Sequence, residues 1–101
     1  MSYNKAPTLH IAALSVELEI TDGITLKDKR QVIRSLLDRI RDRFNVSAAE
    51  VGNLDSPRYA TLAAVVVANE HAFVDRVMSR VASFIEGEPR VVVLAQDLEH
   101  L

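Results

Sequence analysis

The stretch LSVELEITDGITLKDKR, residues 14–30, changes its apolar pattern halfway along and thereby indicates the fold. In residues 14–20, Leu, Val, Leu and Ile alternate with Ser, Glu and Glu, and a period of two is typical of a strand with one buried face. Residues 21–23, Thr-Asp-Gly, are turn formers. Thr25, with Asp28 three residues later, resembles a capping box and predicts a helix start. The first unit is therefore a strand followed by a helix.

The segments that follow this unit predict one long helix and two further strands. Apolar residues recur at helical spacing from Leu26 to a predicted helix end near residues 44–45. Residues 46–51 are small or β-branched and predict a short strand, and residues 52–58 have the composition of a turn. Residues 59–68 are the most apolar run and predict a central strand.

A second helix and a last strand complete the chain. Asn69 is the predicted N-cap, Gly87 and Pro89 are the predicted stop signals, and residues 91–98 read as a strand. The residues expected to form the buried stripe of this helix are Phe73, Val74, Val77, Met78, Val81, Phe84 and Ile85. The order β-α-β-β-α-β, with right-handed crossovers, predicts an α+β ferredoxin-like sandwich of four antiparallel strands with two helices on one face.

The composition fits one small domain. The chain has 101 residues, so we expect a tail over residues 1–8 and a single domain over residues 9–101. It has no cysteine, which excludes disulfides and thiolate metal sites. Its longest apolar run, residues 60–68, is about half of what spans a bilayer. We therefore expect a cytoplasmic protein without a membrane partner.

The outer face of the predicted sheet carries small and aliphatic side chains. If Leu14 and its alternate neighbours point inward, Ala13, Ala63 and Val65 point outward. Two interpretations remain open: central strands are simply hydrophobic, or a second copy of the chain covers this face. The face has no aromatic platform for stacking RNA bases, because Phe44, Phe73 and Phe84 are expected in the helix core. Tyr3 and Tyr59 are the other aromatic residues.

The first helix concentrates positive charge. Seven of the 12 lysines and arginines lie between residues 27 and 43. Lys27, Arg30, Arg34 and Arg41 share a flank within roughly 60° around the helix axis, whereas Lys29, Arg39 and Arg43 are expected on the opposite flank. Such a flank is either an ordinary solvated surface or an anion-binding stripe suited to the phosphates of RNA.

The sequence offers little for catalysis. His10, His71 and His100 are far apart and lack metal-ligand spacing, so we expect no metal site, no cofactor and no enzyme. Glu17 and Glu19 are expected to be solvated. An acylphosphatase-type site needs an arginine in the loop after the first strand, and that loop has none. The alternative to RNA binding is a small-molecule-sensing regulatory domain, in which the turn at residues 21–23 approaches a ligand.

The stretch TLKDKRQVIRSLLDRIRDRFNVSAAEVG, residues 25–52, resembles the YlxP-like family of small bacterial proteins, and the similarity extends from Leu9 to the end. The resemblance rests on a Ser-Leu-Lys-Glu-Lys-Arg-type helix start, an arginine-rich helix, Phe-Asn-Val-Ser and Ala-Glu-x-Gly. It implies a ferredoxin-like fold and an unknown function. Genes of this family often neighbour those for translation initiation and ribosome maturation, so the resemblance also implies ribosome or RNA association. The family positions are Leu26, Lys27, Lys29, Arg30, Arg41, Phe44, Glu50 and Gly52.

Two departures from the family pattern stand out. Thr25 replaces the usual serine, which leaves the cap intact. Tyr59 stands where the family has a basic or polar residue before Ala-Thr-Leu, with Arg58 one position earlier. The role of the loop at residues 53–58 therefore stays open.

Overall fold

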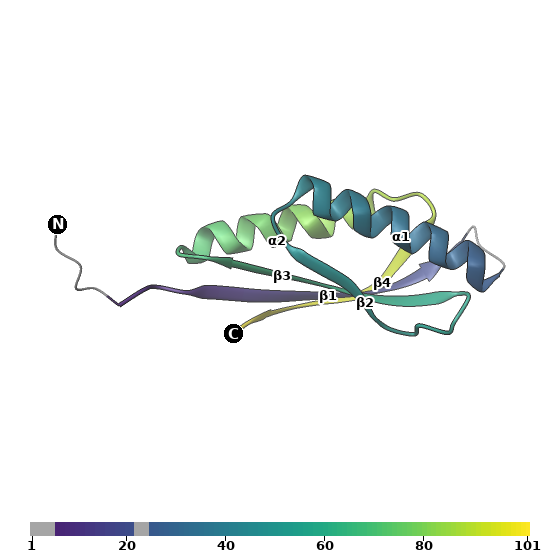
Figure 1. Ribbon diagram of the computed structural model, residues 1–101, viewed down its shortest axis with the longest axis horizontal. Coiled ribbons are helices and arrows are strands. Elements are labelled where there is room, and N and C mark those ends of the chain that lie inside the picture. The colour runs from purple at the N-terminus through teal and green to yellow at the C-terminus, as the bar shows by residue number, and fades with distance from the viewer. Residues whose placement is uncertain (1–5, 22–24) are drawn as a thin grey trace.

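The computed structural model describes residues 6–21 and 25–101. Its elements are β1 (His10–Ile20), α1 (Leu26–Arg43), β2 (Ser47–Gly52), β3 (Tyr59–Ala68), α2 (His71–Glu86) and β4 (Val91–His100). Figure 1 shows both helices on the same face of the sheet. The predicted order and the ferredoxin-like α+β architecture are confirmed.

The four strands form one antiparallel sheet in the order β2-β3-β1-β4. The two central strands, β1 and β3, pair from His10 opposite Ala68 to Glu19 opposite Tyr59. The pairing of β4 with β1 shifts register beside Glu17, and the pairing of β2 with β3 shifts beside Glu50. Each shift marks a bulge, where one strand contributes an extra residue.

The hydrophobic core lies between the sheet and the two helices. Leu14, Val16, Leu18 and Ile20 are buried on β1, as the period-two pattern predicts. The other strands and helices complete the core with Ala48, Ala60, Leu62, Ala64, Val66 and Val91 from the sheet, and Val32, Ile33, Leu36, Leu37, Ile40, Val74, Met78, Val81 and Ile85 from the helices. Burial of this apolar surface is the main force that holds the helices on the sheet.

The two helices start differently. The predicted capping box of α1 is confirmed: the Asp28 amide donates to Thr25 Oγ1 over 3.1 Å, and the Thr25 amide donates to an Asp28 carboxylate oxygen over 3.3 Å. The prediction that Asn69 caps α2 is wrong. The chain stays extended for one more residue, so Glu70 takes the N-cap position, and its side chain makes no capping hydrogen bond among the described residues.

Phe73 was predicted in the core and is 46% exposed, so that prediction is wrong. The buried stripe of α2 runs through Val74 and Met78, and Phe73 lies one position to its side. The Arg76 guanidinium covers the Phe73 ring, 5.8 Å from its centre. Phe44 and Phe84 pack partly buried against the core, edge to face with ring centres 5.8 Å apart.

Two strands are longer than predicted. The first was expected over residues 14–20 and begins at His10, and the last was expected to end at residue 98 and reaches His100. Antiparallel pairing with the end of β3 extends β1 back to His10, and pairing with Ala12 and Ala13 extends β4 to His100. Residues 1–5 of the predicted tail and residues 22–23 of the candidate ligand-binding turn lie outside the described residues. Within the described part, no helix has the length and apolar character needed to cross a bilayer.

Candidate functional site

Lys29, which the sequence places on the flank of α1 opposite Lys27, is buried. Its side chain is 0% exposed, and its Nζ lies 2.6 Å from Glu50 Oε2 on β2. The same ammonium donates to the Asn53 carbonyl oxygen over 2.8 Å. The first turns of α1 therefore bury a cation against the end of β2, and this cation holds the helix to the sheet. A buried ammonium is tolerated only with such partners.

The loop after β2 is shaped to supply one of those partners. Asn53 has a φ of 59°, in the left-handed region that asparagine tolerates better than most residues. Its side-chain Nδ2 donates to Thr61 Oγ1 over 3.0 Å. At Gly52, a Cβ would lie 3.0 Å from both Cβ and Oγ1 of Thr61. This crowded turn presents the Asn53 carbonyl to Lys29, so part of the 53–58 loop has a structural role.

Farther along α1, Arg39 contacts the turn between α2 and β4. Glu88 is buried there, with a side chain 3% exposed, and it accepts hydrogen bonds from Arg90 Nε and Nη2, each over 2.9 Å. Arg39 of α1 also donates to Glu88. The hydrogen bonds from Arg90, together with that from Arg39, lower the pKa of Glu88 to about 2. Arg39 and Arg43 in addition lie over the Phe84 ring.

The four predicted anion-binding residues remain on the flank of α1 nearest β2. Lys27 and Arg34 are exposed and form no ion pair within the described ranges. Arg30 lies 3.9 Å from Asp55, whose side chain is 95% exposed, so this pair is weak. Arg41 is held more firmly, because its Nη2 donates to the Ala48 carbonyl over 2.7 Å. The structure thus leaves three cations available and fixes the fourth on β2.

The open face of the sheet lies opposite the helices. Ala13 pairs with Val65, and Ala63 pairs with Ser15, so the three predicted residues lie side by side on β1 and β3. Val65 is 39% exposed, and the two alanines are partly buried by their neighbours. The large apolar side chains exposed on the three longer strands include Tyr59, Val65, Val67, Val92 and Leu94.

A carboxylate on this open face is neutralised. Glu19 accepts a hydrogen bond from Arg58 Nε over 2.6 Å. Among the described residues, Tyr59 is the aromatic side chain that the strands place here, at the start of β3. One ring does not make the platform on which an RNA-recognition domain stacks two or three bases.

These features define the class of protein: a small ferredoxin-like α+β domain with a basic helix flank and an open sheet face. Residues 11–98 match the family described as "Protein of unknown function (DUF503)", and the chain belongs to that family. It is 31% identical over 75 residues to the "Uncharacterized protein YlxP" of Bacillus subtilis (strain 168), over 74% of this chain and 82% of that protein. The resemblance to YlxP-like proteins is thereby confirmed.

Proposed function

We propose that this protein is a non-catalytic cytoplasmic binding protein that associates with structured RNA, such as the RNA of ribosomal particles, through Lys27, Arg30 and Arg34. The division of charge on α1 carries the proposal. Lys29 and Arg39 are occupied in contacts that hold the fold, whereas Lys27 and Arg34 face solvent without an ion pair in the described part of the chain. Unpaired cations on one flank are available to phosphate oxygens.

The geometry suits contacts with the RNA backbone. Lys27 and Arg34 are seven positions apart, which corresponds to roughly 10 Å along a helix. Arg30 lies between them, so the three cations follow one line along α1. Contacts to phosphates set position and orientation but do not read sequence. We therefore expect recognition of RNA shape and charge, without preference for particular bases.

Charge reversal on the helix flank tests the proposal. Arg30→Glu/Arg34→Glu is compared with Arg76→Glu/Arg80→Glu, which makes the same change in charge on exposed positions of α2. We expect the wild type and the α2 variant to sediment with ribosomal particles at low salt, and the α1 variant to stay in the supernatant. With a fluorescent structured RNA, three phosphate contacts predict a slope of about −2 in log affinity against log salt.

Two outcomes contradict the proposal. If the wild-type protein never sediments with ribosomal particles and binds no structured RNA at 50 mM salt, the basic flank is only a solvated helix surface. If the α1 and α2 variants lose affinity equally, net charge rather than the flank of α1 determines binding.

We further propose that a second copy of the chain covers the open face of the sheet. Exposed apolar side chains on this face include Val65 and Val67 on β3 and Leu94 on β4, and exposed apolar surface of this kind marks interaction sites. The pairing of Glu19 with Arg58 lowers the cost of covering that carboxylate. Light scattering is expected to give twice the chain mass of 11.2 kDa. Val65→Asp should reduce it to the monomer, and Ser79→Asp on α2 should not. A monomeric wild type contradicts this proposal.

A further inference from the structure

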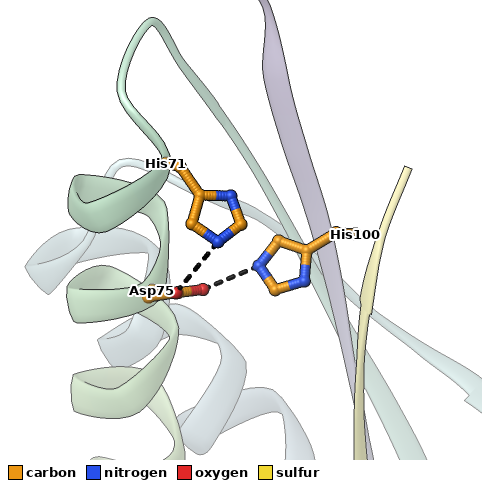
Figure 2. A group of neighbouring side chains, drawn as sticks. All are labelled: His71, Asp75 and His100. Atoms are coloured by element: carbon orange, nitrogen blue, oxygen red, sulfur yellow. Dashed lines mark hydrogen bonds and ion pairs between the residues drawn. The ribbon is translucent and has the colours of Figure 1, made fainter.

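Three histidines that are distant in the sequence meet beside the first turns of α2. His71 begins the helix, Asp75 follows one turn later, and His100 lies at the end of β4. Figure 2 shows the two imidazoles directed at the carboxylate of Asp75. His10, at the start of β1, places its ring edge-on to that of His71, with centres 5.6 Å apart. The sequence spacing of the histidines predicted no metal site, and the fold creates a cluster that this spacing does not reveal.

The three side chains around Asp75 offer a compact set of ligand atoms. His100 Nε2 lies 2.7 Å from Asp75 Oδ1, and His71 Nε2 lies 3.3 Å from Asp75 Oδ2. The ligand atoms of the three residues all lie within 4.8 Å of one another. Tetrahedral zinc, with bonds of about 2.0–2.1 Å, requires ligand atoms roughly 3.4 Å apart. The three ligand atoms therefore lie close to the spacing that one zinc ion requires.

The backbone holds these residues in place before any ion binds. His71 and Asp75 are four residues apart on one helix, so they share a face. His100 is fixed by its pairing opposite Ala12, and the Leu101 amide continues the pairing by donating to the Ile11 carbonyl over 2.8 Å. The rings of His71 and His100 stack at 4.5 Å. A preorganised ligand set loses little conformational freedom on binding.

We propose that His71, Asp75 and His100 bind one divalent transition-metal ion of the zinc type. Each histidine would contribute Nε2 and Asp75 would contribute a carboxylate oxygen, leaving a fourth position for water or another ligand. Two imidazole nitrogens and one carboxylate oxygen suit zinc better than magnesium or calcium, which prefer oxygen ligands. The side chains of His71, Asp75 and His100 are 56%, 44% and 39% exposed, so an ion reaches them from solvent.

The competing interpretation is a proton-mediated cluster, in which Asp75 pairs with protonated imidazoles and no metal binds. The two interpretations differ in proton balance. Zinc coordinates an unprotonated imidazole nitrogen, so its binding displaces any proton from the coordinating nitrogens. The site is separate from the basic flank of α1, and the proposal stands independently of RNA binding.

Calorimetric titration of the chelator-treated full chain with zinc chloride at pH 7.5 tests the proposal. We expect one ion per chain and a loss of affinity of tenfold or more in Asp75→Asn and His100→Ala. Asp97→Asn is the matched control, because it removes one carboxylate from the same strand as His100 on the opposite face of the sheet. Cobalt chloride supplies a second readout, since a four-coordinate cobalt site absorbs in the visible range.

The expected pattern is binding by the wild type and Asp97→Asn, with loss in the two site variants. If Asp75→Asn keeps the native circular dichroism spectrum, its loss of zinc affinity is due to the missing carboxylate and not to unfolding. The proposal is wrong if the wild-type chain gives no binding heat with millimolar zinc and no visible absorption band with cobalt. It is equally wrong if Asp75→Asn and His100→Ala bind zinc as tightly as the wild type does.

Discussion

Lys27 and Lys29 lie two residues apart on α1, yet their environments are opposite. Lys27 is exposed and forms no ion pair within the described residues, whereas Lys29 is fully buried against Glu50 and the Asn53 carbonyl. The difference follows from helix geometry, because two residues turn a side chain by about 200° around the axis. One lysine therefore holds the helix on the sheet, and the other is available to a partner.

The comparison extends to the arginines of the same helix. Arg39 reaches buried Glu88 on one side, and Arg34 faces solvent on another. Removing one member of a buried ion pair leaves a desolvated charge without compensation, whereas removing an exposed charge costs little. The seven cations of α1 thus divide by environment into residues that stabilise the fold and residues that remain available for binding.

The largest expected effect comes from Lys29. Lys29→Met removes the ammonium that compensates Glu50, and we expect the free energy of unfolding to fall by about 3 kcal/mol. Lys27→Met is the matched control and should change it by less than about 0.5 kcal/mol. Urea unfolding of both variants gives the two values. Equal losses in the two variants would contradict the division between buried and exposed cations.

Glu88 makes a contribution of similar size. We expect Glu88→Gln to lower the free energy of unfolding by about 3 kcal/mol at pH 7, because the folded protein holds the pKa of Glu88 at about 2, below its ordinary value of 4.5. The stability that this ionisation supplies is present above pH 4.5 and is lost as the pH falls toward 2. Glu17→Gln, at an exposed position of β1, is the control.

Urea unfolding of these two variants and the wild type between pH 7 and pH 2 measures the effect. The difference between wild type and Glu88→Gln should shrink across the window from pH 4.5 to pH 2. A difference that stays constant over that window would show that Glu88 acts by packing alone.

A smaller effect is expected at Gly52, which supports the turn that faces Lys29. Gly52→Ala places a Cβ 3.0 Å from Thr61 Oγ1, and such overpacking costs about 1–2 kcal/mol. Gly87→Ala provides the contrast, because its nearest atoms lie 3.5 Å away and its φ of −77° suits alanine. Thermal unfolding should show a lower midpoint for the first variant and no loss for the second. The reverse order would contradict the close approach at Gly52.

The smallest effect on stability is expected for Arg30→Glu/Arg34→Glu. Both side chains are exposed, and Arg30 has only a weak pair with Asp55. The free energy of unfolding should therefore change by less than about 1 kcal/mol, while RNA binding is lost. Urea unfolding and RNA titration on the same preparation separate the two effects. A large loss of stability would show that these arginines belong to the fold.

The fold follows from local sequence patterns because each element carries its own signal. The alternation over residues 14–20, the capping box at Thr25 and the apolar run over residues 59–68 predict the type and order of three elements correctly, although β1 begins four residues before the alternation. The predicted cap at Asn69 is wrong because the backbone stays extended to Glu70, a choice that the side chain alone does not determine.

The candidate sites are less predictable because they depend on contacts between distant segments. Helical periodicity gives the angular position of Lys29 on α1. Its burial, however, depends on where the turn after β2 lies. The spacing of His71 and Asp75 is visible as a helical i, i+4 pair. Their meeting with His100 depends on pairing between the start of β1 and the end of β4. The sequence pattern predicted both strands too short at these ends.

Acetylation of lysines in the native protein tests the division of cations on α1 most directly. A small excess of an amine-reactive acetylating reagent is applied in native buffer and in 8 M urea, and tandem mass spectrometry locates the modified lysines. Lys27 should react in both conditions, whereas Lys29, which is 0% exposed and bonded to Glu50 and Asn53, should react only in urea. Equal modification of Lys27 and Lys29 in the native protein would contradict the account.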